Sequence, residues 1–218
     1  MQGRHGAALV IGVLGALACR PPPAPNPPPP PPLRTRPEPP SAPAGPTAEA
    51  RQRAQELVGE GGLALQEGRS AAAVELFDQA LALDPSSAEA YAWRGETHSR
   101  LGEFAAAEAD FDRSLELQPD FAGSWFGRAG VKAWLERYED ALSDYDRALE
   151  LDPFLIYAWV GRGRTLHRLG HYERAIADYD RALADGVAVG DLGWVRSLRE
   201  EAQAKLAEEA SPQADPPR

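Results

Sequence analysis

Small and large side chains recur along this chain with a period of 34 residues. Three prolines, Pro85, Pro119 and Pro153, repeat that interval. Periods in this range indicate stacked supersecondary units, and 34 residues is the length of a helix-turn-helix unit. The pattern predicts four such units, at residues 54–87, 88–121, 122–155 and 156–189.

Five columns of the aligned units keep the same class of side chain. Small residues at positions eight and twenty are expected to let the two helices of a unit approach closely, and those at position twenty-seven to face a neighbouring unit. Large residues at positions four and twenty-four are expected to fill the space between helices. The small columns are Gly61, Gly95, Ala129 and Gly163; Ala73, Ala107, Ala141 and Ala175; and Ala80, Ser114, Ala148 and Ala182. The large columns are Leu57, Tyr91, Trp125 and Trp159, and Phe77, Phe111, Tyr145 and Tyr179.

Turn signals separate the predicted helices. The residue before a proline avoids the helical region of backbone space, so each of the three prolines is expected to end the second helix of its unit. Ser86 and Glu89 form a predicted capping box for the helix that follows the first proline. Turns between paired helices are expected at Gly68, Gly102 and Gly170, and at Glu136, which takes the place of glycine in the third unit.

The phased spacing of small, large and aromatic residues with proline resembles the tetratricopeptide repeat family over Ala54 to Val189. The resemblance implies an all-α fold, a right-handed α-solenoid of four helix-turn-helix repeats plus a C-terminal capping helix. It also implies a non-catalytic role in protein-protein interaction, because repeats of this family commonly bind protein or peptide partners in a concave groove. That groove is lined by the first helix of each unit.

The resemblance places the partner-binding groove on positions two, five, nine and twelve of each unit. In the third unit these positions give the groove an open, apolar lining, with Phe126 beside Tyr157 and Val160 of the fourth unit. Chaperone-binding members of the family use a lysine, asparagine and arginine clamp, and no lysine or asparagine stands at these positions, which disfavours that role. The candidate groove residues are Phe126, Tyr157, Val160, Arg164 and His167.

Arginine and aspartate occupy two further columns in phase with each other. Position seven holds Arg94, Arg128 and Arg162, and position twenty-three holds Asp110, Asp144 and Asp178. In the first unit both columns change together, to Glu60 and Leu76. Because a guanidinium binds a carboxylate through two parallel hydrogen bonds, we predict an arginine-aspartate pair between the two helices of units two, three and four.

The end of such an array exposes an apolar face that needs a polar cover. Residues 190–210 supply one apolar stripe on an otherwise charged segment, which predicts a capping helix. The last eight residues, 211–218, are expected to be a disordered tail. The stripe consists of Leu192, Val195, Leu198, Ala202 and Leu206.

The N-terminal part has a different composition. Twelve apolar residues, 7–18, follow Arg4, which is typical of a signal peptide over residues 1–18 and too short for a membrane span. Ala18 precedes Cys19 as in the lipobox of bacterial lipoproteins, so the resemblance implies a diacylglycerol on Cys19. Ala16-Leu17-Ala18 is also a site for ordinary signal peptidase, which would release a soluble exported protein.

Fifteen of the 21 prolines fall between residues 21 and 46. Proline fixes φ and lacks a backbone donor, so residues 19–53 are expected to be a disordered, proline-rich tether and a lead-in to the first helix. A lipidated Cys19 would then hold the repeats at a bacterial membrane. Arg20 is not the aspartate that marks inner-membrane retention in some bacteria, which favours the outer membrane, facing the periplasm.

Charge and candidate chemistry narrow the function. The net charge of −10 argues against a nucleic-acid partner and makes a basic partner more natural, and the single cysteine excludes an intrachain disulfide. No phosphate loop, nucleophile elbow or zinc-protease motif is present, so neither catalysis nor a cofactor is expected. His167 and His171 have a metal-compatible spacing without a completing ligand. Asp144 and Asp146 recur in register and are expected on a solvated helix face.

Overall fold

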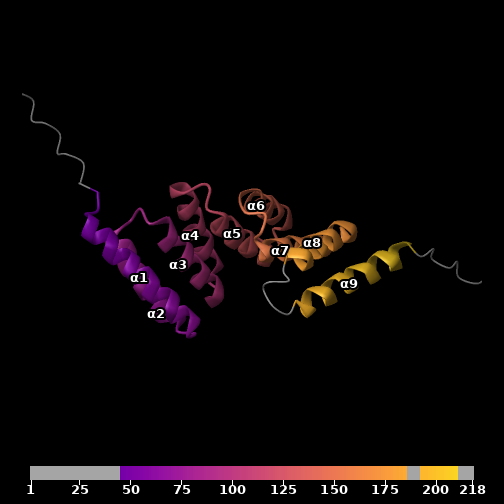
Figure 1. Cartoon of the computed structure of the whole chain (residues 1–218), viewed down its shortest axis with the longest axis horizontal. Coiled ribbons are helices and arrows are strands. Elements are labelled where there is room, and N and C mark those ends of the chain that lie inside the picture. The colour runs from indigo at the N-terminus through magenta and orange to yellow at the C-terminus, as the bar shows by residue number, and fades with distance from the viewer. Residues whose placement is uncertain (1–44, 186–191, 211–218) are drawn as a thin grey trace, which may run out of the picture. The chain divides into compact units, whose positions relative to one another are not determined.

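The computed structural model describes residues 45–185 and 192–210, and all regular structure in these ranges is helical (Figure 1). This confirms the predicted all-α fold. The helices are α1 (Ala48–Gln66), α2 (Ser70–Leu83), α3 (Ala88–Leu101), α4 (Phe104–Leu117), α5 (Ala122–Trp134), α6 (Tyr138–Leu151), α7 (Ile156–Arg168), α8 (Tyr172–Asp185) and α9 (Gly193–Ala210).

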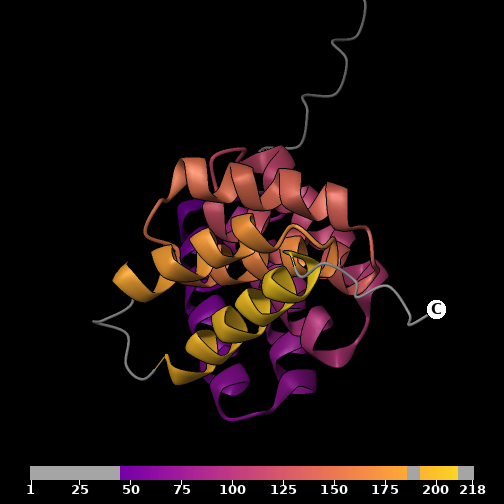
Figure 2. The ribbon, with the colours of Figure 1, turned by 90° about the vertical axis from the view of Figure 1, so that its right-hand side faces the viewer.

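The helices pack as antiparallel pairs in chain order. The pairs are α1 with α2, α3 with α4, α5 with α6, and α7 with α8. The second helix of each pair contacts the first helix of the next, and the first helices of neighbouring pairs also touch. The last helix, α9, lies against α8 in the place that the first helix of a fifth unit would take (Figure 2). Each unit therefore covers only its neighbours, as in a helical solenoid.

The first helix begins earlier than the repeat pattern. Thr47 caps α1 by accepting a hydrogen bond from the Ala50 amide at 3.1 Å, a geometry typical of threonine at this position. Residues 48–53, expected as a lead-in, therefore form the first turns of α1. The predicted signal peptide, the predicted lipidation of Cys19 and the predicted tail at residues 211–218 fall outside the described residues, as does the link at residues 186–191.

The predicted turns between paired helices are confirmed. Gly68, Gly102 and Gly170 have φ of 77°, 78° and 78°, and Glu136 adopts the same left-handed region with φ of 58°. Only glycine reaches this region without steric cost, so Glu136 is the one strained turn residue among the four.

The predicted capping box is wrong. Ser87, one residue later than expected, caps α3 by accepting from the Ala90 amide at 3.2 Å. Ser86 instead donates from Oγ to Oδ1 of Asp84 at 2.5 Å. Asp84 accepts hydrogen bonds from both the amide and the hydroxyl of Ser86 in the turn around Pro85. Because the Ser86 hydroxyl is bound there, Ser87 caps the helix that begins at Ala88.

The small columns permit the close helix approach that the sequence predicts. A Cβ added at Gly95 would lie 3.2 Å from the carbonyl oxygen of Ala107 in the paired helix, and one at Gly163 would lie 3.3 Å from that of Ala175. Ser114, at position twenty-seven, is fully buried and contacts Oγ of Ser124 in the next unit at 2.7 Å. The contacts within a unit and between units are thus of the predicted kinds.

The arginine-aspartate pairing is confirmed in units two, three and four. Nε of each arginine donates to Oδ2 of its aspartate at 2.8 Å, and a terminal nitrogen donates to Oδ1 at 2.6 to 2.9 Å. The guanidinium also lies over the aromatic ring at position four, 4.7 Å from the ring centre at Trp125 and Trp159. The pairs are Arg94 with Asp110, Arg128 with Asp144, and Arg162 with Asp178.

Each of these arginines also reaches back to the preceding unit. The remaining terminal nitrogen donates to an aspartate at position twenty-five, at 2.5 to 2.6 Å. One cation therefore joins two carboxylates from adjacent units. The preceding-unit partners are Asp78 for Arg94, Asp112 for Arg128, and Asp146 for Arg162. We call these three arginines with their six aspartates the arginine ladder.

The capping helix continues the arginine ladder by one step. Arg199 in α9 donates to Oδ1 of Asp180 at 2.9 Å, and Asp180 occupies position twenty-five of the fourth unit. Val195 and Ala202 on the same helix are fully buried. Helix α9 thus joins the last unit through the same type of contact as the first helix of a repeat.

The aspartates at positions twenty-three and twenty-five do not share one solvated face, so that expectation is wrong for half of them. Asp144 is buried, with a side chain 4% exposed, and it accepts from Lys132 as well as from Arg128. Asp146 has a side chain 51% exposed. Two residues along a helix turn a side chain by about 200°, so one carboxylate faces the paired helix and the other faces outward.

Candidate partner-binding site

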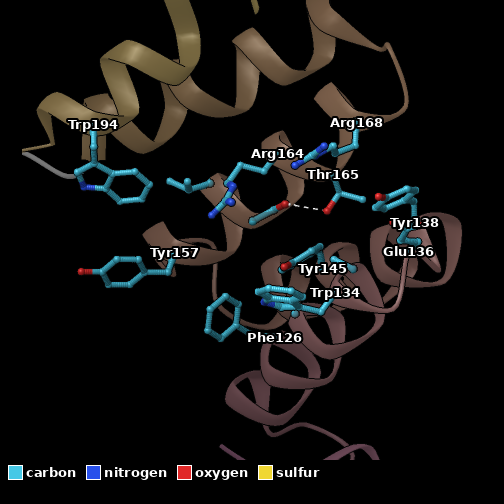
Figure 3. A pocket seen from close by; sticks show the side chains of 14 residues that line it. Phe126, Trp134, Glu136, Tyr138, Tyr145, Tyr157, Arg164, Thr165, Arg168 and Trp194 are labelled. Carbon is cyan, nitrogen blue, oxygen red and sulfur yellow. Dashed lines mark hydrogen bonds between the residues drawn. The ribbon is translucent and has the colours of Figure 1, made fainter. Parts of the chain in front are cut away.

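A pocket of about 520 Å³ opens between the third unit, the fourth unit and the capping helix (Figure 3). Helices α5 and α7 supply most of its lining, α6 supplies two tyrosines and α9 one tryptophan. We call it the aromatic pocket. Its lining is Phe126, Gly130, Ala133, Trp134, Glu136, Tyr138, Tyr145, Tyr157, Val160, Gly161, Arg164, Thr165, Arg168 and Trp194.

Several of the aromatic side chains in this pocket are open to solvent. Trp134 is 74% exposed, Tyr157 52% and Trp194 46%. Phe126 is partly buried, and its ring is tilted against that of Tyr145 with the ring centres 6.2 Å apart. Large aromatic side chains gathered in a concave site are typical of surfaces that bind a partner.

Tyr145 forms part of the floor of the pocket because α7 carries a glycine opposite it. A Cβ added at Gly161 would lie 2.6 Å from the phenol oxygen of Tyr145, so no other residue fits there without a shift. Burial raises the pKa of Tyr145 to about 12, although Arg164 opposes the rise. The phenol is therefore protonated at neutral pH and can donate a hydrogen bond.

The charge of the pocket differs from that of the whole chain. Arg164 and Arg168 lie one turn apart on α7 and are exposed. In the part of the chain that the structure describes, neither forms a side-chain hydrogen bond or an ion pair, whereas the arginines of the ladder each bind two aspartates. A chain with a net charge of −10 thus carries two unneutralised cations beside its aromatic pocket.

The structure brings four of the five predicted groove residues together. Phe126, Tyr157, Val160 and Arg164 line the aromatic pocket. Val160 is only 3% exposed, so it contributes to the wall more than to the open surface. His167 does not line this pocket; it packs edge-on against Tyr172 and borders a neighbouring recess.

Sequence reasoning missed several lining residues. Trp134 and Arg168 both stand at position thirteen of their units, one residue beyond the last groove position considered, and this shared position is the signal that could have found them. Trp134 also stacks on Phe104 of the preceding unit, with ring centres 5.7 Å apart. Trp194 comes from α9, and no repeat column predicts its place.

The described residues were searched for a metal site and for a membrane-spanning helix. No group of three or more histidine, cysteine, aspartate or glutamate side chains is placed to hold a metal within residues 45–185 and 192–210. Among the helices of these ranges, none combines the length and the hydrophobicity needed to cross a membrane. What the site presents is aromatic surface and two arginines, which suits the holding of a ligand.

Comparison with known proteins agrees with this architecture. The family model described as Tetratricopeptide repeat matches residues 58–122, 94–156 and 135–188, which together span more than half of the chain. A search of curated proteins gave no match.

Solved structures with the same architecture are numerous. TTC0263, a thermophilic TPR protein of Thermus thermophilus, is 25% identical with a TM-score of 0.60, and the match covers 73% of this chain and 92% of that one. The first TPR domain of Spaghetti (RPAP3), bound to the HSP90 peptide SRMEEVD, is 25% identical with a TM-score of 0.53 over 55% of this chain and 94% of that one. MamA is 22% identical with a TM-score of 0.55, over 72% of this chain and 84% of that one, and shows the fold alone.

Proposed function

The chain belongs to the tetratricopeptide repeat family, and from that premise we propose that it is a non-catalytic scaffold that holds a protein or peptide segment in the aromatic pocket. Proteins of this family generally mediate protein-protein interactions. The observation that carries the proposal is the convergence of exposed aromatic side chains from α5, α7 and α9 on one concave site. The similar domain bound to an HSP90 peptide supports a peptide ligand for such a fold.

The size of the site also supports an extended ligand. A pocket of about 520 Å³ is within the range of ligand sites in proteins, roughly 300 to 1,000 Å³, and it is open to solvent along its exposed aromatics. Aromatic side chains carry much of the energy of protein interfaces because they bury a large area and lose little conformational freedom. A segment of a few residues with bulky side chains fits this lining.

A charge placed in the pocket tests the proposal. We expect Phe126→Glu and Tyr157→Glu each to weaken binding of a captured octapeptide by about tenfold or more, because a carboxylate there must be desolvated against aromatic surface. The octapeptide comes from a soluble synthetic library incubated with the full immobilised chain, and its affinity is measured by fluorescence polarisation.

Phe154→Glu is the matched control for these variants. Phe154 is a phenylalanine with 73% of its surface exposed, and it lies outside the lining of the pocket. Its replacement should leave affinity and helicity unchanged. Equal loss in all three variants, or capture of no peptide by the unaltered chain, would contradict a ligand site in the aromatic pocket.

We further propose that the scaffold is exported and anchored to a bacterial membrane through an acylated Cys19. The only cysteine of the chain stands directly after Ala18, and a proline-rich stretch follows it. Several acyl chains give stable anchoring where one alone is marginal. With Arg20 after the cysteine, we place the protein at the outer membrane, facing the periplasm. The net charge of −10 favours a protein partner over a nucleic acid.

The mass of the mature N-terminus tests the anchor. We expect a protein that starts at Cys19 with attached acyl chains and that fractionates with membranes, and we expect Cys19→Ser to lose both properties. A mature chain that starts at Cys19 or beyond without acylation would instead support a soluble exported adaptor, which the small residues Ala16 and Ala18 favour through an ordinary cleavage site.

A further inference from the structure

The polar groups around the aromatic pocket are mainly unpaired hydrogen-bond donors. In Figure 3 the hydrogen bond marked within the lining runs from the Thr165 hydroxyl to the carbonyl of Gly161. The indole, phenol and guanidinium groups of the lining form no hydrogen bond in the part of the chain that the structure describes. Indole and guanidinium groups can only donate, and Tyr145 keeps its proton because burial raises its pKa to about 12. A ligand rich in acceptors and poor in donors therefore fits this pocket.

A run of prolines is a ligand of that kind. Proline has a backbone carbonyl but no N–H group, so a proline run offers acceptors and no donors. Such a run is extended before it binds and loses little conformational freedom, and proline-rich segments bind aromatic-lined grooves for this reason. Trp134, Tyr157 and Trp194 expose aromatic surface on which proline rings can pack. The chain carries such a run at residues 27–32, within its proline-rich stretch.

The proline run is close enough in the sequence to reach the pocket. Residues 33–44 separate it from Gly45, where the described chain begins. At about 3.1 Å per residue, these twelve residues span roughly 37 Å when extended. The first helices contact one another in the order α1, α3, α5 and α7. Packed helices lie about 8–10 Å apart, so the three steps from α1 to α7 cover roughly 24–30 Å.

Charge also allows the run to lie in the pocket. Residues 27–32 are uncharged, so Arg164 and Arg168 do not repel them. The charged residues on either side of the run are mostly basic, whereas the chain as a whole has a net charge of −10, so attraction to the acidic repeats adds to the contact. The charged residues around the run are Arg20, Arg34, Arg36 and Glu38.

We propose that residues 27–32 occupy the aromatic pocket of their own molecule as an internal ligand, which an outside partner must displace. The proline carbonyls accept from the free donors of the lining, and the proline rings pack on the exposed aromatics. A ligand on a short flexible link competes at an effective concentration in the millimolar range, on the order of, so the run lowers the affinity for every partner of the pocket. This rests on the proposed function and adds the regulation of that site.

The test compares two forms of the full chain with one probe, a fluorescent peptide that has the sequence of residues 27–36. We expect the probe to bind the serine variant about tenfold more tightly than the unaltered chain, because the run no longer competes. Fluorescence polarisation measures both affinities. The serine variant carries Pro27→Ser, Pro28→Ser, Pro29→Ser, Pro30→Ser, Pro31→Ser and Pro32→Ser.

A second serine variant is the matched control. It loses the same number of prolines from the same stretch but keeps residues 27–32 intact, so it should bind the probe as weakly as the unaltered chain does. Its substitutions are Pro21→Ser, Pro22→Ser, Pro23→Ser, Pro25→Ser, Pro37→Ser and Pro39→Ser.

Tryptophan substitutions in the first serine variant assign the probe to the pocket. Trp134→Ala should weaken probe binding by about tenfold or more, since an exposed aromatic side chain of the lining is lost. Trp93→Ala should leave it unchanged, because Trp93 is 39% exposed and lies outside the lining. Circular dichroism checks that both variants keep their helices.

The outcomes separate this inference from the function on which it rests. Equal probe affinity in the unaltered chain and the first serine variant, or an equal gain in the control variant, would overturn the internal ligand. Dimers of the unaltered chain that the first serine variant does not form, seen by analytical ultracentrifugation, would assign the run to the pocket of a second copy and overturn the contact within one molecule. Capture of library octapeptides without any binding of the probe would remove the proline run from the pocket and leave it a peptide site, whereas capture of neither would overturn both.

Discussion

Replacing Arg162 with methionine is expected to lower the free energy of unfolding by about 3–5 kcal/mol, because it leaves a buried carboxylate without its cation. Arg162 binds Asp178 through two hydrogen bonds and Asp146 through a third. The side chain of Asp178 is only 6% exposed. Urea unfolding, followed by far-ultraviolet circular dichroism, measures the loss.

Two further variants isolate the cause. Arg128→Met should cost less, because Asp144 keeps Lys132 at 2.7 Å. Arg162→Met combined with Asp178→Leu should recover much of the loss, since removal of both members of a buried pair is often close to neutral.

The exposed pair of Arg147 and Glu150 is the control for the ladder. Their side chains are 46% and 65% exposed, and Arg147→Met should change stability by less than about 1 kcal/mol. If Arg162→Met were no more destabilising than Arg147→Met, the arginine ladder would not be the element that holds the units together.

Replacing Phe111 with alanine is expected to cost about 3–5 kcal/mol, because the cavity would lie between two units. Phe111 is 2% exposed, and its ring lies between Gly95 of its own unit and Gly127 of the next. A Cβ added at Gly127 would lie 2.5 Å from Cε1 of that ring. Gly127→Ala alone should therefore destabilise by about 1–3 kcal/mol through overpacking, although alanine is the better helix former.

The two substitutions should not be additive. In the Phe111→Ala background the ring is gone, so Gly127→Ala should become stabilising by up to about 1 kcal/mol. Gly62→Ala is the control, since nothing lies within 4 Å of a Cβ added there, and it should stabilise the unaltered protein. A stabilising Gly127→Ala in the presence of Phe111 would show that the ring does not require glycine. Thermal and urea unfolding of the four variants measure these differences.

Much of the fold could be predicted from residues that act within one unit. Gly95 and Ala107 belong to two columns that each keep a small residue every 34 positions. Small side chains at both positions allow the two helices of a unit to pack closely. The columns that hold Arg94 and Asp110 change residue type together in the first unit, which predicted that these two side chains pair. The structure confirms the pair, with 2.6 Å between a terminal nitrogen of Arg94 and Oδ1 of Asp110. Such contacts depend on helical period and side-chain size, which are local properties.

Contacts between units were harder to predict. Asp146 is exposed as expected, but Arg162 of the next unit also binds it, and the columns of a single unit do not predict that contact. Likewise, the three atoms nearest to a Cβ added at Gly127 all belong to Phe111 of the preceding unit, so the residues of one unit do not show why glycine stands there. The predicted capping serine, Ser86, is one residue too early because its hydroxyl donates to the side chain of Asp84 in the turn before the helix.

The sequence by itself determined that this protein is a row of paired helices closed by a final helix, and it pointed to four of the residues that line the aromatic pocket. Only the tertiary structure decided that Trp134, Trp194 and Arg168 join them, and that a recess lined by Tyr179 lies alongside. The physical reason is that periodicity sets which face a side chain takes on its own helix. The meeting of side chains from α5, α7 and α9 depends instead on how successive units rotate and on where α9 settles, which many distributed contacts set together.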